Sequence, residues 1–225
     1  MIAAGVGSRL RPHTDLYAKP LLPIDGRPVL GMLLRELAAA ACPHVTLVTW
    51  HLAEQVERFA GDGTAWGLPL TTVRQARPDG SADAVVTAAA AAPYLVLGAD
   101  TLFAPGDVGR FAASFLSSGA AGALAVTRRR ADEPGRNGVG VEDGLVRALQ
   151  VAGSPFAGAP LWAVGPGLAA IVETLPGAPP YELATAFAQA IDAGEHVAGI
   201  EIGSTRDLTA PADLLHENFP YLQGL

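Results

Sequence analysis

Two glycines and then two arginines stand at every second position near the start of the sequence, at Gly5, Gly7, Arg9 and Arg11. The apolar residues before them predict a short strand, so the glycines fall where the chain must turn. A glycine backbone can approach a ligand closely and direct its N–H groups at an anion, and a nearby arginine adds charge-assisted hydrogen bonds. The segment therefore predicts a phosphate-binding loop, although an ordinary turn after a strand also fits. It matches neither the Walker A loop nor the dinucleotide-binding fingerprint.

Lys19 is the only lysine in a chain that contains fourteen arginines. Arginine therefore serves wherever a surface cation is needed for solubility. A retained lysine indicates a position that requires a compact ammonium group rather than a planar guanidinium group. We interpret Lys19 as a candidate site residue that belongs with the glycine loop.

The stretch from Gly5 to Ile24 resembles the signature of the sugar-1-phosphate nucleotidyltransferase family, which includes thymidylyltransferases and uridylyltransferases of glucose-1-phosphate. The matching residues are Gly5, Gly7, Ser8, Arg9, Leu10, Pro12, Thr14, Lys19, Pro20, Leu21, Pro23 and Ile24. The resemblance continues through most of the chain. It implies an enzyme that transfers a nucleoside monophosphate from a nucleoside triphosphate to a sugar-1-phosphate and releases pyrophosphate, with UTP or dTTP favoured as the donor.

The resemblance also implies roles for individual residues. Arg9 and Lys19 are expected to be catalytic: Arg9 holds the β- and γ-phosphates, and Lys19 offsets charge on the α-phosphate and on the acceptor phosphate. The nucleotide-binding residues that it implies are Ala4, Gly5, Gly7, Ser8, Arg9, Gln75, Gly80 and Ser81. The acceptor-binding residues that it implies are Lys19, Gly138 and Gly158.

Gln75 and Gly80 have the spacing of the family's nucleobase segment, in which a glutamine and a later glycine meet a pyrimidine. A glutamine side chain offers both a donor and an acceptor, as the edge of uracil or thymine requires. From the local pattern alone, a glutamine at a strand end followed by a turn explains these residues equally well.

Asp100 ends the apolar stretch YLVLGAD, and open α/β sheets bind ligands at the carboxyl ends of their strands. By resemblance, Asp100 and Asp207 are ligands of Mg²⁺, a cation that prefers hard oxygen ligands and few protein contacts. Taken singly, each aspartate also fits a helix cap or a solvated loop residue.

Three departures from the family pattern keep alternatives open. Only two residues precede the AAG sequence, so the first strand is short or the natural chain begins upstream. The stretch 148–153 lacks the Glu-Lys-Pro that contacts a hexose phosphate in many relatives, and 204–210 lacks the usual tryptophan and glycine. The alternatives are a cytidylyl- or guanylyltransferase acting on phosphocholine, a phosphonate or a cyclitol phosphate, and a non-catalytic nucleotide-binding relative.

Strand-like and helix-like segments alternate, which predicts βαβ units and an α/β fold with a doubly wound, mostly parallel, Rossmann-like sheet. The expected strands are 44–50, 68–75, 93–100, 122–127, 158–165 and 196–203, with a hairpin over 138–150 as a small antiparallel edge region. The expected helices are 28–41, 52–60, 81–92, 106–118, 167–175, 181–193 and 211–218. Ser81 and Asp107 are expected as helix N-caps. A single domain is favoured over 1–225, with a nucleotide-binding half (1–127) and an acceptor-binding half (128–225).

The net charge of −7 argues against nucleic acid or an anionic membrane as a partner, because both attract basic surfaces. The sequence contains no apolar run of the length that crosses a bilayer. A single cysteine, Cys42, excludes an internal disulfide and a cysteine-built zinc site, so the expected location is the reducing cytoplasm. The expected partners are a nucleoside triphosphate and a small phosphorylated acceptor, bound by a monomer or a homodimer.

Overall fold

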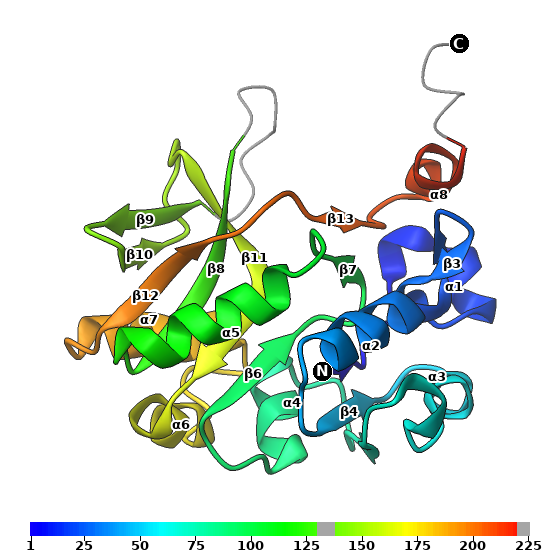
Figure 1. Ribbon diagram of the computed structural model, residues 1–225, viewed down its shortest axis with the longest axis horizontal. Helices are drawn as coiled ribbons and strands as arrows, with labels where there is room; N and C mark the ends of the chain where they lie inside the picture. The colour runs from blue at the N-terminus through cyan, green and yellow to red at the C-terminus, as the bar shows by residue number, and fades with distance from the viewer. Residues whose placement is uncertain (130–137, 220–225) are drawn as a thin grey trace. The chain divides into compact units, whose positions relative to one another are not determined.

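The computed structural model of the chain describes residues 1–129 and 138–219 (Figure 1). The chain divides into two compact units that interleave along the sequence. Unit 1 consists of Met1–Pro78, Gly98–Leu102 and Arg206–Leu225, and unit 2 of Asp79–Leu97 and Phe103–Thr205. The expectation of one domain that divides near residue 127 stays a prediction. Among the described helices, none combines the length and hydropathy of a membrane-spanning segment.

A three-stranded parallel sheet forms the centre of unit 1, in the order β1–β4–β5. Its strands are β1 (Ile2–Ala3), β4 (Val45–Thr49) and β5 (Leu70–Arg74). The central strand β4 is buried at every position except Thr46, as an inner parallel strand should be. The first strand is as short as the sequence indicates, and a parallel bridge from Ile2 to Gly98 adds pairing on its second side.

Short helices and strand pairs complete unit 1 around this sheet. They are η1 (Ser8–Leu10), α1 (His13–Leu16), η2 (Lys19–Leu21), β2 (Pro23–Ile24), β3 (Arg27–Pro28), α2 (Val29–Ala39), α3 (Ala53–Ala60), η3 (Thr64–Trp66), β7 (Thr101–Leu102), β13 (Arg206–Asp207) and α8 (Pro211–Asn218). α3 connects β4 to β5 and packs against both strands.

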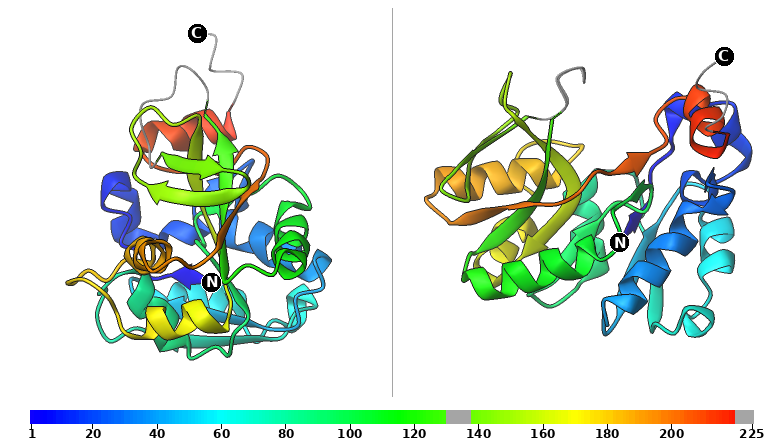
Figure 2. Two further views of the ribbon diagram at one scale, coloured as in Figure 1. Left: turned by 90° about the vertical axis from the view of Figure 1, so that its left-hand side faces the viewer. Right: turned by 45° about the horizontal axis from the view of Figure 1, so that its top comes forward.

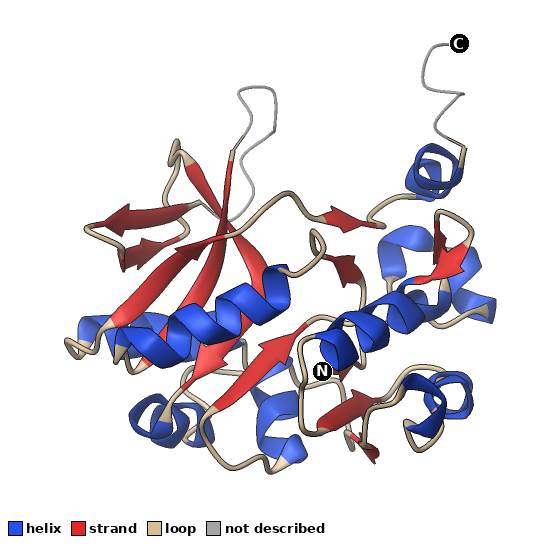
Figure 3. Cartoon of the chain, viewed as in Figure 1, coloured by secondary structure: helices blue, strands red, loops and turns tan. Residues whose placement is uncertain are grey.

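A six-stranded mixed sheet forms the centre of unit 2, in the order β6–β11–β8–β12–β10–β9. Its strands are β6 (Tyr94–Leu97), β8 (Gly122–Arg128), β9 (Val139–Glu142), β10 (Leu145–Leu149), β11 (Phe156–Val164) and β12 (Val197–Glu201). Its helices are α4 (Ser81–Ala88), α5 (Asp107–Ser118), α6 (Pro166–Glu173) and α7 (Leu183–Asp192). α5 covers one face of this sheet and α7 the other (Figures 1 and 2), and the long strands between them stand out in Figure 3.

The structure confirms the α/β class, and the expected strands and helices are present close to their expected bounds. Antiparallel pairing is more extensive than the expected edge region. β11 returns between β6 and β8 and pairs antiparallel with both, so antiparallel pairing reaches the middle of the unit 2 sheet. The periodicity of an isolated strand does not reveal the direction in which it will pair. The predicted fraction of parallel strand pairs was therefore too high.

The two expected N-caps, Ser81 and Asp107, are wrong by one position. Gly80 and Gly106 occupy the N-cap positions of α4 and α5, and the predicted residues are the first residues inside these helices. Both glycines have positive φ values, 105° and 80°, which residues with a Cβ rarely adopt. Ser81 Oγ instead accepts a hydrogen bond of 2.8 Å from the backbone N–H of Leu183, at the start of α7.

Each unit has an apolar core that follows the helical repeat. α2 buries Leu30, Leu33 and Leu37, which recur at the spacing of one helix face. In unit 2, Phe187 of α7 is fully buried and packs edge-on against Trp162 of β11, with ring centroids 4.6 Å apart. These contacts fix the helices on the sheets and thereby fix the loops at the ends of the strands.

Candidate active site

The predicted phosphate loop leaves the carboxyl end of β1 at Ala4, which is buried. Gly7 has a φ of 66°, and a Cβ at this position would lie 2.8 Å from Thr14 Cγ2 and 3.3 Å from Lys19 Cβ. Gly5 is exposed and has nothing within 4 Å of the place where a Cβ would stand. Packing therefore requires the glycine at position 7, whereas the backbone at Gly5 is open to a ligand.

A buried threonine fixes the shape of this loop. Thr14 is fully buried, and its Oγ1 donates a hydrogen bond of 2.9 Å to the carbonyl oxygen of Gly7. The backbone N–H of Leu10 donates to the same oxygen at 2.8 Å. Ser8 and Arg9 are exposed, and Arg9 forms no ion pair with any residue in the described ranges. The loop thus presents a cation that is available to an external anion.

Lys19 and Asp100 form an ion pair in which Nζ donates to Oδ2. The lysine side chain is 13% exposed and the aspartate side chain 35% exposed, so water screens this pair less than a surface pair. Lys19 also lies directly against Gly7, as the Cβ distance at that glycine shows. One predicted catalytic residue therefore connects the glycine loop to one predicted metal ligand.

Asp207 lies on β13, which pairs antiparallel with β7 so that Asp207 stands opposite Thr101, the neighbour of Asp100. Its Oδ2 accepts a hydrogen bond of 3.0 Å from Thr209 Oγ1. Within the described part of the chain, no group of three or more His, Cys, Asp or Glu residues forms a metal site. Two partly exposed carboxylates on adjoining segments fit a hard divalent cation that takes its other ligands from substrate oxygens and water.

Gln75 lies one residue beyond β5 and is only 5% exposed. Its backbone N–H donates to the carbonyl oxygen of Thr49 at 2.9 Å. Ala3 pairs with Thr49, and Thr49 pairs with Arg74, so the three parallel strands end together. Gln75 and the glycine loop therefore lie at the same carboxyl edge of the unit 1 sheet, the edge at which open α/β sheets bind ligands.

Gly80 and Ser81 belong to unit 2, where both have structural contacts. A Cβ at Gly80 would lie 2.3 Å from the carbonyl oxygen of Tyr181, an oxygen that also accepts a hydrogen bond from Ala82. Ser81 Oγ donates to Glu182 Oε2 at 2.6 Å. The fold of unit 2 therefore accounts for both residue types, and their contact with a nucleotide stays a prediction.

Gly138 and Gly158 also belong to unit 2. A Cβ at Gly138 would lie 1.9 Å from the carbonyl oxygen of Val151, and the backbone N–H of Val151 donates to Gly138 at 2.8 Å. Gly158 pairs with Val126 of β8 immediately before the register shift in β11. Close backbone approach explains the first glycine, and the acceptor-binding role of both stays a prediction.

Arg206 precedes Asp207, and no sequence pattern indicated a role for it. Its guanidinium group binds the carboxylates of Asp25 and Glu217. The hydrogen bond from Arg206 holds the pKa of Asp25 below its ordinary value. No local signal could have revealed this contact, because Asp25 and Arg206 are 181 positions apart.

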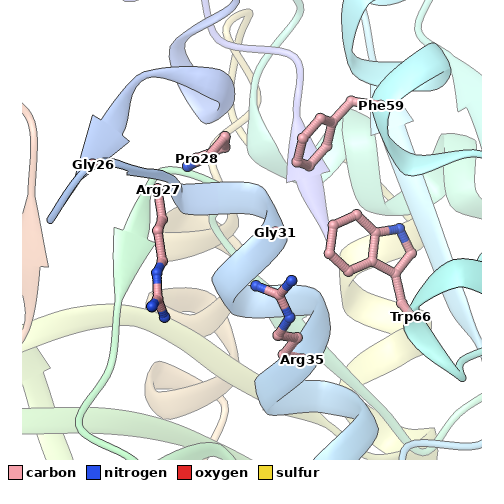
Figure 4. A pocket seen from close by; sticks show the side chains of 7 residues that line it. All are labelled: Gly26, Arg27, Pro28, Gly31, Arg35, Phe59 and Trp66. Carbon is pink, nitrogen blue, oxygen red and sulfur yellow. The ribbon is translucent and has the colours of Figure 1, made fainter.

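A cavity of about 520 Å³ lies elsewhere in unit 1. Its lining residues are Gly26, Arg27, Pro28, Gly31, Arg35, Phe59 and Trp66 (Figure 4). The guanidinium group of Arg35 already lies over the ring of Trp66, 5.3 Å from its centroid. None of the predicted site residues lines this cavity.

Comparisons with known proteins show the family of the chain. Residues 1–152 match the model of the nucleotidyl transferase family. A glucose-1-phosphate thymidylyltransferase of Streptomyces antibioticus is 42% identical over 88 residues, which are 39% of this chain and 25% of that protein. A mannose-1-phosphate guanylyltransferase of Mycobacterium tuberculosis is 38% identical over 89 residues, which are 40% of this chain and 25% of that protein.

Among solved structures, the chain resembles a Bacillus anthracis protein assigned as a glucose-1-phosphate thymidylyltransferase and crystallised with sucrose. The TM-score is 0.83 at 18% identity, over 96% of this chain and 92% of that chain. At this identity the likeness shows a shared α/β fold. Because the family model covers more than half of the sequence, the chain belongs to the nucleotidyl transferase family. The two curated relatives match over 25% of their own length.

Proposed function

We propose that this chain transfers a nucleoside monophosphate from a nucleoside triphosphate, with UTP or dTTP favoured, to a sugar-1-phosphate. A phosphate oxygen of the acceptor attacks the α-phosphorus in line, the bond from the α-phosphorus to its bridging oxygen breaks, and pyrophosphate leaves. The acceptor is already an anion, so no side chain has to remove a proton. Positioning and charge neutralisation then supply most of the rate enhancement.

The proposal rests on a chain of contacts that connects the glycine loop, Lys19, Asp100 and the segment of Asp207. The glycine loop lies against Lys19, Lys19 forms an ion pair with Asp100, and Asp207 is paired to the residue that follows Asp100. A phosphate-binding loop, a partly buried ammonium and two carboxylates are the groups that phosphoryl and nucleotidyl transfer require.

Each residue of this set has a distinct proposed role. The backbone at Gly5 and the exposed guanidinium group of Arg9 bind the β- and γ-phosphates of the donor and stabilise the leaving pyrophosphate. Lys19 offsets charge on the α-phosphate and the incoming phosphate. Asp100 and Asp207 would hold Mg²⁺, which supplies charge neutralisation at phosphate oxygens when bound.

The carboxylate of Asp100 has two oxygens, and only Oδ2 accepts from the Lys19 ammonium group. Oδ1 could therefore hold a metal ion while Lys19 stays beside the glycine loop, where its compact charge would meet substrate phosphate.

The identity of the donor base and of the acceptor is the finer part of the proposal. Gln75 at the sheet edge favours a pyrimidine base, whereas one of the relatives is named for guanylyl transfer and another for thymidylyl transfer. A cytidylyltransferase for a different phosphorylated molecule is a second candidate, because the chain has no lysine besides Lys19 for a hexose phosphate. Cytoplasmic location and a monomeric or homodimeric state also remain proposals.

Pyrophosphate release tests the proposal. The purified chain with Mg²⁺ is supplied with dTTP, UTP, CTP, GTP or ATP, each against glucose-1-phosphate, mannose-1-phosphate, N-acetylglucosamine-1-phosphate and phosphocholine. Asp100→Asn should abolish release. The matched control is Asp143→Asn, because Asp143 lies in the β9–β10 turn with a φ of 51°, a conformation that asparagine adopts equally well.

Release that requires a sugar phosphate, stops with EDTA and disappears in Asp100→Asn would support the proposed reaction and its metal. Release with phosphocholine and CTP alone would favour the second candidate. Nucleotide binding without pyrophosphate release in every combination would contradict an enzymatic function and favour a non-catalytic relative.

A further inference from the structure

Arg206 is the centre of a polar cluster formed by Asp25, Arg206 and Glu217. Nη1 and Nη2 of Arg206 donate to the two carboxylate oxygens of Asp25 at 2.6 and 2.9 Å. Nε donates to Glu217 Oε2 at 2.7 Å. The planar guanidinium group thus binds one carboxylate through two hydrogen bonds and a second carboxylate through a third. A lysine ammonium group could not reproduce this geometry.

Other contacts already join the β2–β3 hairpin to α8 without the arginine. The backbone N–H of Asp25 donates to the carbonyl oxygen of Glu217 at 3.2 Å. The side chain of Asn218 accepts a hydrogen bond from Gly26 and donates one to Pro23, both at 2.8 Å. The particular contribution of Arg206 is therefore to attach β13 to the β2–β3 hairpin and α8.

β13 needs such an attachment because it is very short. The strand consists of Arg206 and Asp207, and its partner β7 is also two residues long. A ladder of this length is marginal by itself. On the far side of Asp207, Asp213 Oδ2 accepts hydrogen bonds of 2.7 Å from the backbone N–H groups of Thr209 and Ala210. Side-chain hydrogen bonds on both sides of Asp207 therefore supplement its two-residue pairing with β7.

We propose that Arg206 is a positioning residue for the metal ligand Asp207: by anchoring β13 to the β2–β3 hairpin and α8, it holds the Asp207 carboxylate beside Asp100. This inference rests on the proposed function, which makes Asp207 a metal ligand.

Binding of Mn²⁺ to the purified chain, measured by the loss of the free-ion signal in electron paramagnetic resonance, tests the inference separately from turnover. Asp207→Asn defines the signal from the site itself. Arg206→Gln should weaken Mn²⁺ binding by about 10-fold, the lower end of the range for groups that orient metal ligands. Arg206→Lys should recover part of the loss, since it restores a charge without the fork.

Asn218→Ala is the matched control because it removes two contacts between the β2–β3 hairpin and α8 but none of Arg206. It should lower the thermal stability of the protein and leave the Mn²⁺ affinity unchanged. A merely structural role would instead make Mn²⁺ affinity follow stability in both variants, and that result would overturn the inference.

The possible results separate the two proposals. If Asp207→Asn abolishes binding and Arg206→Gln does not weaken it, the positioning role is wrong while the reaction can still stand. If Arg206→Gln weakens binding as expected but no acceptor supports pyrophosphate release, the positioning role stands and the reaction is wrong. Equal Mn²⁺ binding by the unmodified chain and Asp207→Asn would overturn the positioning role together with the metal assignment.

Discussion

The ammonium group of Lys19 and the carboxylate of Asp100 form a partly buried ion pair, although 81 positions separate the two residues in the sequence. The contact joins the loop region after β1 to the segment after β6. Since Lys19 also lies against Gly7, the pair fixes the relation between the phosphate loop and a predicted metal ligand within unit 1.

Replacement of Lys19 should impair catalysis more than folding. Lys19→Met removes the charge that offsets the phosphates and should lower kcat for pyrophosphate release by about 100-fold or more, as the loss of a preorganised electrostatic contact does. Lys19→Arg retains the charge but should not restore the rate, because a planar fork does not replace a compact ammonium beside Gly7.

The comparison of these two variants is informative in itself. Steady-state kinetics would measure kcat of both variants with the nucleotide and the acceptor that release pyrophosphate fastest. Full activity in Lys19→Arg would show that only the charge matters and would contradict the inference drawn from the retained lysine.

The two loop glycines should respond differently to alanine. Gly7→Ala places a Cβ 2.8 Å from Thr14 Cγ2 on a backbone with positive φ, so we expect a loss of about 1–3 kcal/mol in the free energy of unfolding. Gly5→Ala meets no atom within 4 Å and should leave stability unchanged. Urea unfolding measures both, and nucleotide affinity of Gly5→Ala should still fall if its backbone meets phosphate. Equal stability of the two variants would mean that the loop is not packed as described.

Local features of the site were accessible from the sequence because they lie within one short segment. The turn at Gly5 and Gly7 and the unusual lysine at position 19 could be recognised without knowing the fold. The α/β alternation then placed Asp100 at a strand end, where a ligand site was expected. The ion pair between Lys19 and Asp100 was not predicted, since it depends on which loops the sheet brings together.

Long-range contacts explain the remaining differences. Ser81 is a residue type that favours N-caps, but it is the first residue inside α4 and its hydroxyl meets Leu183, 102 positions away. Arg206 looks like any surface arginine in a chain that uses arginine throughout, and its partner Asp25 lies in a hairpin that no periodicity indicated. In both cases the side chain acts on a distant segment, which a pattern read along the chain cannot show.

A hydrogen-bonded pair next to Gln75 should make stability depend on pH. Arg74 donates to both carboxylate oxygens of Glu57 at 2.7 Å, and Thr49 Oγ1 donates to one of them at 2.9 Å. Arg74 is the main cause that lowers the pKa of Glu57 from its ordinary value of 4.5. A group with a lowered folded-state pKa stabilises the protein above its unfolded-state pKa, and this contribution is lost as the pH falls through the folded-state pKa.

Arg74→Gln should therefore lower the urea midpoint at pH 7, and its difference from the unmodified chain should shrink as the pH falls below 4.5. The expected effect is modest because the Arg74 side chain is half exposed. Arg58→Gln is the control, since Arg58 lies beside Glu57 on α3, is exposed and has no ion pair in the described ranges. A difference for Arg74→Gln that stays constant from pH 7 to pH 3.5 would contradict the role of Glu57.

Ser81 distinguishes a structural role from a nucleotide contact. Its Oγ caps the start of α7, so Ser81→Ala should lower the free energy of unfolding by about 1 kcal/mol, the usual cost of losing a helix cap. Ser117→Ala serves as the control, because within the described residues the exposed Ser117 Oγ donates only to the carbonyl oxygen of Ser114 in its own helix. Thermal unfolding and nucleotide titration on both variants separate the possibilities. A loss of stability with unchanged nucleotide affinity would assign Ser81 to the fold of unit 2 alone, whereas a loss of affinity with unchanged stability would contradict the capping role and favour the contact that the family pattern implies.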